Sequence, residues 1–113
     1  MQRDCVINVQ EKDGMAIIEI LGDLTASSEE PMNSAYKKAC EYKTEKIIFK
    51  FDGKSRVNSA GIAIMINLVI ESQDQKRKIF IVGVSKHFHK IFDLVGLGRY
   101  TTIVESEEEV RNL

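Results

Sequence analysis

A serine hydroxyl at the predicted start of a helix is the group in this sequence that is best placed for chemistry. The local sequence is Asn58, Ser59, Ala60, Gly61, and an almost wholly apolar run over residues 62–70 follows it. This run is too long for a typical strand and too short to span a bilayer, which favours a helix buried on several sides. Asn58 then lies at the N-cap, where its side-chain oxygen can accept a hydrogen bond from an unpaired first-turn amide.

Phosphorylation is the modification that this position would accommodate. The hydroxyl of Ser59 would face the positive end of the helix dipole, where a phosphate would meet backbone amides and a favourable field. Lys54 and Arg56 lie close by and could pair with that phosphate, although a solvated loop is the simpler interpretation of both. A purely structural interpretation is also open, in which Asn58 caps the helix, Ser59 is a small first-turn residue and Gly61 permits close packing.

Other patterns that could carry chemistry are incomplete. His87 and His89 are two residues apart, so on a helix they point in different directions and cannot share a metal ion. Gly53, Lys54 and Ser55 resemble the end of a phosphate-binding loop, but the earlier glycine that such a loop requires is missing. No serine has a base and an orienting acid at a recognisable spacing. We therefore expect no metal and no cofactor, and an enzyme is the least supported class.

The elements that would position Ser59 follow from hydrophobic periodicity. Apolar residues alternate over residues 5–10 and become denser over 15–21, with a turn at 12–14 between them, which predicts a β-hairpin. Residues 46–51 are β-branched and aromatic and predict a strand. With the helix after it and the run 78–82, this strand forms a β–α–β unit long enough for a right-handed parallel crossover. The sheet is therefore predicted to be mixed.

An amphipathic helix is predicted before this unit. Its apolar stripe has helical spacing and comprises Met32, Ala35, Tyr36, Ala39 and Cys40. The start of the helix is ambiguous. Ser27 and Glu30 have capping-box spacing, whereas Pro31 is acceptable only near a helix start.

Two helices and a short strand are predicted after the unit. Ser85 can cap a helix that Gly96 stops, and the apolar stripe of this helix comprises Phe88, Ile91, Phe92 and Val95. Residues 101–104 predict a short strand. Ser106 and Glu109 then have capping-box spacing at the start of a last helix.

Composition limits the functional classes. The 113 residues fit one compact domain, residues 1–113, with enough apolar side chains for a core. The formal net charge is −1 with both signs mixed along the chain, so neither direct nucleic-acid binding nor a polybasic membrane tether is predicted. Cys5 and Cys40 are expected to be buried free thiols. The first residues include Arg3 and Asp4 and lack an apolar signal core, so we expect a cytoplasmic location without membrane insertion.

The serine motif and the order of elements resemble the STAS domain, and in particular the bacterial anti-sigma factor antagonists. The signature of these proteins is Asp, Ser, a small residue and Gly at the start of the second helix, and the matching residues here are Asn58, Ser59, Ala60 and Gly61. A Gly-acidic-hydrophobic turn of the family is matched by Gly22, Asp23 and Leu24. Leu94, Val95, Gly96 and Leu97, at the end of the helix predicted after Ser85, resemble the usual end of the corresponding helix in the family. The likeness covers nearly the whole chain and departs from the signature at Asn58, where the family has aspartate.

The resemblance implies an α/β fold, a single STAS-like domain with a mixed four- to five-stranded sheet packed with about four helices. It also implies that Ser59 is phosphorylated by a partner that is both serine kinase and anti-sigma factor. That partner would bind the unmodified protein and release the phosphorylated one. The expected partner-binding residues are Asp23, Thr25, Arg56, Asn58, Ser59, Ala60 and Gly61. A homodimer is left open.

Three functional classes stay open at this point. The first is a non-enzymatic, phosphorylation-controlled antagonist of an anti-sigma factor. The second is a STAS binding module of a transporter or sensor complex, or a small-ligand binder, that phosphorylation does not regulate. The third is a small enzyme. Asn58 lowers the support for the first class and raises the support for the second, because the family's aspartate is absent.

Overall fold

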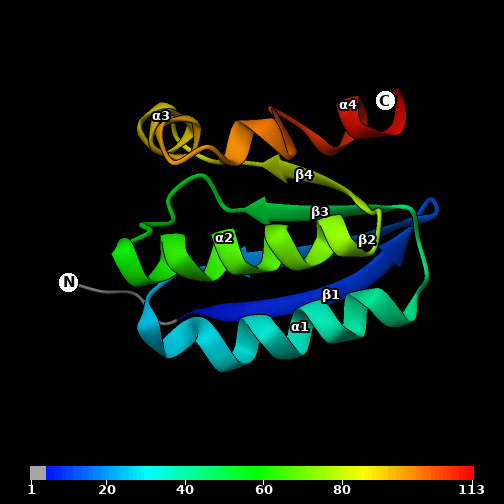
Figure 1. Cartoon of the computed structure of the whole chain (residues 1–113), viewed down its shortest axis with the longest axis horizontal. Helices are drawn as coiled ribbons and strands as arrows, with labels where there is room; N and C mark the ends of the chain where they lie inside the picture. Colours follow the sequence, from blue (N-terminus) through cyan, green and yellow to red (C-terminus); the bar gives the residue numbers. More distant parts are fainter. Residues whose placement is uncertain (1–4) are drawn as a thin grey trace.

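The computed structural model describes residues 5–113, in which an opening hairpin is followed by alternating helices and strands (Figure 1). The strands are β1 (Val6–Lys12), β2 (Met15–Leu21), β3 (Lys46–Phe51), β4 (Lys78–Val82) and β5 (Thr101–Val104). The helices are α1 (Glu29–Glu41), α2 (Ser59–Asp74), α3 (Lys86–Leu94) and α4 (Glu107–Arg111), with short 3-10 helices η1 (Ala26–Ser28) and η2 (Leu97–Arg99). Arg3 and Asp4 lie outside the described residues.

The five strands form one mixed sheet whose strand order is the chain order, β1-β2-β3-β4-β5. β1 pairs antiparallel with β2, and every later pair is parallel. Asp13 and Gly14 have φ of 54° and 76°, which is the backbone that a two-residue Asp-Gly hairpin turn requires. The predicted hairpin, mixed sheet and later strands are confirmed, and β1 begins and ends slightly later than the predicted span 5–10.

The main core lies on one face of the sheet, under α1 and α2. Phe49 from β3, Met65 from α2 and Phe92 from α3 are fully buried there. Tyr36 of α1 is also buried, and its hydroxyl has no hydrogen-bond partner among residues 5–113. Burial, and then the neighbouring Cys40, raises the pKa of Tyr36.

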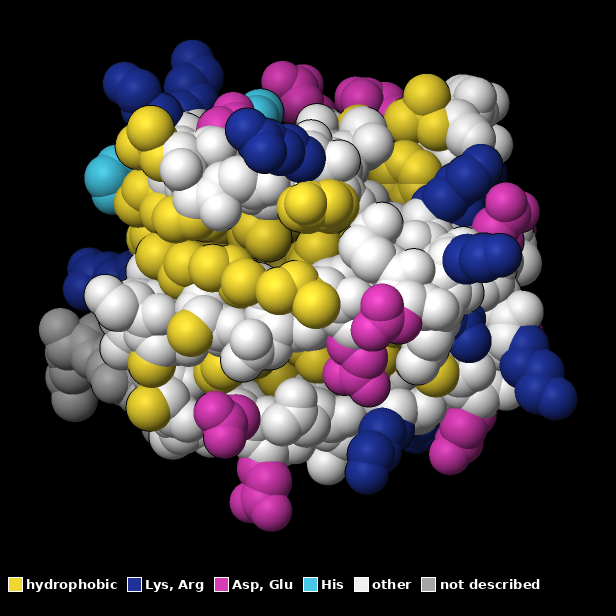
Figure 2. Space-filling model, viewed as in Figure 1, with side chains coloured by type: hydrophobic (Ala, Val, Ile, Leu, Met, Phe, Trp, Pro, Cys, Tyr) yellow, Lys and Arg dark blue, Asp and Glu magenta, His cyan; other side chains and the backbone are white. Residues whose placement is uncertain are grey.

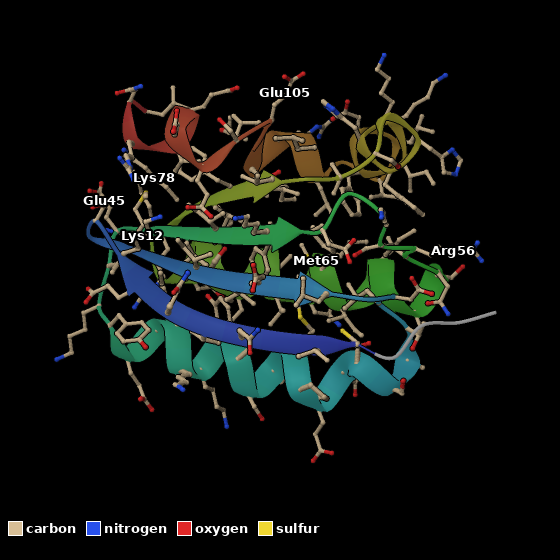
Figure 3. All side chains as sticks on the ribbon, turned by 180° about the vertical axis from the view of Figure 1, so that it is seen from behind. Lys12, Glu45, Arg56, Met65, Lys78 and Glu105 are labelled. Atoms are coloured by element: carbon tan, nitrogen blue, oxygen red, sulfur yellow. The ribbon has the colours of Figure 1, made fainter. Side chains whose placement is uncertain are left out.

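The opposite face of the sheet carries a smaller apolar cluster beside α4, and Figure 3 views the molecule from this side. Val110 of α4 is fully buried against this face, and its carbonyl accepts a hydrogen bond of 2.9 Å from Lys46 Nζ. Lys50 Nζ lies 2.6 Å from Glu107 Oε1. These contacts fix the last helix to the middle of the sheet.

The start of α1 differs from the expectation. The helix begins at Glu29 after the turn η1, and the capping-box residues are Thr25 and Ser28, not Ser27 and Glu30. The amide of Thr25 donates to Ser28 Oγ over 3.1 Å. The extra turn moves the cap toward the N-terminus. The predicted stripe is confirmed except for Cys40, which is only half-buried.

The end of α3 also differs from the expectation. Ser85 caps the helix as predicted, since its Oγ accepts from Phe88 N over 3.2 Å, and Gly96 stops it with a φ of 86°. Val95, however, lies just past the helix end and is 43% exposed. The left-handed turn at Gly96 reverses the chain, so Leu97 enters the core in its place.

Two smaller expectations, at Ser106 and at the cysteines, have a structural outcome. Ser106 precedes α4 as predicted, but its side chain makes no capping hydrogen bond. Cys5 and Cys40 are free but half-buried, so the prediction of buried thiols is wrong in degree, and burial raises the pKa of Cys5. Within residues 5–113, no helix has the length and apolar character needed to cross a membrane.

Candidate functional site

Two loops that follow parallel strands β2 and β3 are joined side by side at one end of the sheet. Leu24 N donates to Arg56 O over 2.8 Å, and Asn58 N donates to Leu24 O over 3.3 Å. These bonds make a short parallel bridge between Leu24 and Val57. The backbone that leads into α2 is therefore held by the loop after β2, at the edge of the sheet where sites in α/β proteins collect.

Two carboxylates hold these loops through backbone amides. Asp23 is 3% exposed, and its Oδ1 accepts from Arg56 N over 3.0 Å. Asp52 Oδ2 accepts from Gly22 N over 3.2 Å, and Asp52 Oδ1 accepts from Lys54 N over 2.8 Å and from Ser55 Oγ over 3.0 Å. Each acid thus connects its own loop to the neighbouring one.

The N-cap of α2 is confirmed. Asn58 is extended, and its Oδ1 accepts from Gly61 N over 2.9 Å. Ser59 is the first residue of the helix and its side chain is exposed. The amides of Ser59 and Ala60, at the start of the first turn, have no intrahelical acceptor, so the Ser59 hydroxyl lies beside backbone donors at the positive end of the helix.

Gly61 has a packing role that the sequence had left as one of two interpretations. A Cβ atom at this position would lie 2.3 Å from the carbonyl oxygen of Leu24. No real Cβ contact is this short, so a glycine is required where the first turn of α2 meets the loop after β2. The close approach brings Ser59 next to that loop.

The structure brings six of the seven predicted partner-binding residues into one cluster, which comprises Asp23, Arg56, Asn58, Ser59, Ala60 and Gly61. Arg56, Asn58 and Ser59 are exposed, whereas Asp23 and Gly61 are buried and shape the backbone. Thr25 is the N-cap of η1, is 8% exposed, and has its Oγ1 3.0 Å from Ser27 Oγ. Only part of the predicted set is therefore available at the surface.

The exposed rim of the cluster is basic. Lys54 and Arg56 are exposed, and neither forms an ion pair with another residue in the described range 5–113. Figure 3 shows Arg56 at the end of the molecule opposite Lys12, Glu45 and Lys78. Two exposed cations beside a helix N-terminus make this end of the molecule attractive to an anionic group.

An apolar strip on the outside of α2 runs from Ser59 along the helix. This strip, called the outer stripe of α2, comprises Ile62, Ala63, Ile66 and Ile70. Ile70 is 55% exposed, and Figure 2 shows a band of apolar side chains between α2 and α3 on this face. The prediction that the helix is buried on several sides is therefore wrong, because α2 is an outer element with only one face against the core.

Sequence reasoning missed two parts of this site. The bonds of Asp52 were not predicted, although an aspartate followed by glycine can bind the amide two residues on, as Asp52 does with the amide of Lys54. The outer stripe could not be recognised directly, because the run 62–70 is almost wholly apolar and has more apolar residues than one helix face can bury. Its signal was the four-residue spacing of Ile62, Ile66 and Ile70.

The histidines of α3 contact different groups. His89 Nε2 lies 3.5 Å from Asp93 Oδ2, whereas the His87 ring contacts the Phe88 ring edge-on. Within residues 5–113, no group of three or more His, Cys, Asp or Glu side chains is arranged to hold a metal ion.

Comparisons with known proteins place this arrangement in a family. The model of the STAS domain matches residues 6–110. An anti-sigma factor antagonist from Mycobacterium paratuberculosis superposes with a TM-score of 0.80 at 12% identity, over 96% of this chain and 92% of that chain. No curated protein matches the sequence.

Two further similar structures are of SpoIIAA, and the first of them is from Bacillus. The cell fate determinant SpoIIAA in its phosphorylated form gives a TM-score of 0.67 at 17% identity, over 95% of this chain and 97% of that chain. The anti-sigma factor antagonist SpoIIAA in its unphosphorylated form gives 0.69 at 14% identity, over 94% of both chains. At these identities the superpositions establish a common fold.

Proposed function

The chain belongs to the STAS domain family, and on this premise we propose that it is an anti-sigma factor antagonist. It is proposed to act without enzymatic activity of its own, in the cytoplasm, as a partner of an anti-sigma factor that is also a serine kinase. The observation that carries the proposal is the exposed Ser59 at the start of α2, beside Asn58 and Arg56. One similar structure, SpoIIAA, is of a protein in a phosphorylated form, which supports a phosphorylated site in this fold.

In the proposed cycle, the kinase binds the unmodified surface around Ser59. Ser59 Oγ attacks the γ-phosphorus of ATP, the bond from that phosphorus to the bridging oxygen of ADP breaks, and a base of the kinase takes the hydroxyl proton. Asn58 Oδ1 already accepts from the Gly61 amide and is neutral, so Asn58 caps and does not act as the base. The phosphate adds charge to the docking surface, and the partner is released.

A second candidate function rests on Asn58. Because asparagine stands where the family has aspartate, the same surface could serve a STAS binding module that is never phosphorylated. The partner would then be a transporter subunit, a sensor protein or a small ligand. The two functions differ in whether Ser59 is modified.

Phosphopeptide mapping tests the site of modification. After incubation with the cognate kinase and ATP, the phosphate is expected on Ser59, and Ser59→Ala should abolish its incorporation. Ser55 is an internal control, because its Oγ is held by Asp52 Oδ1 over 3.0 Å and the residue is buried. Stoichiometric modification of Ser55 with Ser59 unmodified would refute the proposed site.

The effect of the charge is tested with a pair of variants at Ser59. Ser59→Asp should weaken binding to the kinase without lowering the melting temperature, because a negative charge in the first turn of a helix stabilises it by ~0.3 to 1 kcal/mol. Ser59→Asn has nearly the same shape without the charge and should bind better than Ser59→Asp. Equal affinities of the two variants would show that charge is not the switch.

Pull-down from the native host with the unmodified protein as bait separates the two functions. Recovery of a small ATP-dependent serine kinase supports the antagonist. Recovery of transporter subunits, with Ser59 unmodified in the cell, supports the binding module instead.

A further inference from the structure

We propose that the outer stripe of α2 is a surface on which two copies of this chain associate with their α2 helices antiparallel. The proposal concerns the protein alone and goes beyond the proposed function. Its starting point is the exposure of the stripe: Ala63 and Ile70 are exposed, and Ile62 and Ile66 are half-buried at the edge of the main core. Figure 2 shows a band of apolar side chains on the outside of α2 that continues toward α3.

The spacing of the isoleucines suits a two-fold axis. Ile62, Ile66 and Ile70 are each four residues apart, so they form one ridge along the helix. An axis through Ile66 sets Ile62 of one copy opposite Ile70 of the other. The same patch then serves both copies, as an isologous interface requires.

The acids in the last turns of α2 favour the antiparallel orientation. Lys54 and Arg56 are exposed before the helix start, while Glu71 and Asp74 are exposed in its last turns and Lys76 is exposed just after its end. α2 has no acidic residue in its first turn and no basic residue in its last, so Glu71 and Asp74 oppose its own dipole. An antiparallel copy brings Asp74 near the positive start of the second α2, whereas a parallel copy would bring like charges together.

The acids at the end of α2 have no ion-pair partner within the part of the chain that the structure describes. In the described range, neither Glu71 nor Asp74 forms an ion pair. Arg77, which follows the helix, donates instead to the carbonyl oxygens of Thr44 and Cys40 over 2.7 and 3.2 Å. The carboxylate of Asp74 is therefore available to a second copy.

The area of this surface implies a weak dimer. A helix of 16 residues is ~24 Å long, and one face of it offers less than the ~800 Å² that each partner of a standard interface buries. Tyr100 extends the surface, because it is exposed and its carbonyl accepts from Gln73 Nε2 over 3.4 Å near the end of α2. We therefore expect an association that depends on protein concentration.

Ser59 lies at the edge of the proposed interface. With Ile66 on the axis, Ser59 comes close to Gln73 and Asp74 of the second copy. A phosphate on Ser59 would then face a carboxylate, so phosphorylation is expected to dissociate the two copies. Any other protein that docks at Ser59 would compete with self-association.

Sedimentation equilibrium of the full chain, from about 5 μM to 1 mM, tests the proposal. The wild type should show a reversible monomer–dimer equilibrium, and Ile70→Lys and Asp74→Lys should each raise the dissociation constant at least about tenfold. Val6→Lys is the control for Ile70→Lys, because Val6 is 53% exposed on β1. Glu41→Lys is the control for Asp74→Lys, because Glu41 is an exposed acid at the end of α1. Both controls should match the wild type.

A charge exchange tests the orientation. Arg56→Glu combined with Asp74→Lys should restore the dissociation constant to within about threefold of the wild type, because each copy again presents opposite charges. A monomer at every concentration, a dimer insensitive to Ile70→Lys, or a double variant weaker than both single variants would overturn the proposal. The assay contains only this protein, so its failure would leave the kinase-binding proposal standing.

Discussion

At the scale of single residues, substitutions of Asn58 distinguish a role in capping α2 from a role in phosphoryl transfer. Its Oδ1 makes the bond to Gly61 N that an aspartate would also make. Asn58→Asp should therefore change the free energy of unfolding little, whereas Asn58→Ala should lower it by ~1 kcal/mol. Urea denaturation measures both. The matched control is Asn67→Ala, on the exposed side of the middle of α2, which should stay within about 0.5 kcal/mol of the wild type.

The same residue bears on the rate of phosphorylation. If the kinase supplies the base, single-turnover phosphorylation of the wild type and of Asn58→Asp should proceed at similar rates. A positioned acid or base contributes about a hundredfold or more. A gain of that size in Asn58→Asp would mean that Ser59 is a poor phosphoacceptor in this chain, and the unphosphorylated binding module would become the better proposal.

The buried hydroxyl of Tyr36 is expected to cost stability. Since the hydroxyl has no partner among residues 5–113, Tyr36→Phe should raise the free energy of unfolding by about 1 kcal/mol at pH 7. The raised pKa adds a pH dependence. Tyrosine in the unfolded chain ionises near pH 10, while Tyr36 in the folded chain resists ionisation, so the wild type should lose stability as the pH rises above about 10.

The comparison of wild type and Tyr36→Phe across pH isolates this effect. The stability difference between the two proteins should be constant between pH 7 and 9 and should grow above about pH 10 in favour of the variant. Tyr42→Phe is the control, because Tyr42 is only half-buried. A variant less stable than the wild type at pH 7 would mean that the hydroxyl is satisfied in solution.

The residues with local roles were predictable from the sequence. Asn58 at the N-cap and Ser85 at the start of α3 follow from side-chain chemistry that acts within three residues. The bond from Asp52 to Gly22 could not be predicted, because it spans 30 residues and depends on the sheet that sets the two loops side by side.

At the scale of elements, the contact between α2 and the loop after β2 depends on a missing side chain. Gly61→Ala would place a Cβ 2.3 Å from the Leu24 carbonyl, so one of the two segments must move. We expect a loss of about 1 to 3 kcal/mol in the free energy of unfolding, as in other overpacked sites. Thermal and urea denaturation measure the loss. Ser59→Ala, in the same turn but exposed, should be nearly neutral, and a neutral Gly61→Ala would contradict the close approach.

Most elements could be predicted because strand and helix periodicities differ. The strands 46–51 and 78–82 match the structure residue for residue. The predictions failed where tertiary packing decides which side chains are buried. Val95 has the spacing of the α3 stripe, but the chain reversal at Gly96 exposes Val95 and buries Leu97. Periodicity within one element does not encode such a reversal, nor does it say which side of α2 lacks a neighbour.

At the scale of the whole molecule, the second face of the sheet depends on the short helix α4. Val110 is fully buried against that face, so Val110→Ala should lower the free energy of unfolding by about 1 to 3 kcal/mol. Hydrogen exchange should show that the amides of α4 open more often in the variant, while those of β3 open only with global unfolding. Leu113→Ala is the control, because Leu113 is 57% exposed and should contribute little.

The fold class could be predicted from the order of the elements, with little knowledge of contacts between distant residues. A hairpin followed by alternating helices and strands leaves few arrangements that obey right-handed crossovers, and the mixed STAS-like sheet is one of them. The placement of α4 on the far face could not be predicted, because its five residues carry too little periodicity to define a direction.

The agreement between strand order and chain order has a consequence for synthesis on the ribosome. β1 and β2 form a hairpin from local contacts, and each later strand pairs with the strand made just before it. The nascent chain can therefore extend the sheet at a single advancing edge, and no early strand has to wait for a distant one. Domains generally fold with their N-terminal parts first as they emerge. During translation, the nascent chain is most exposed to pairing with other chains before β5 emerges, because the outer edge of β4 is then still unpaired.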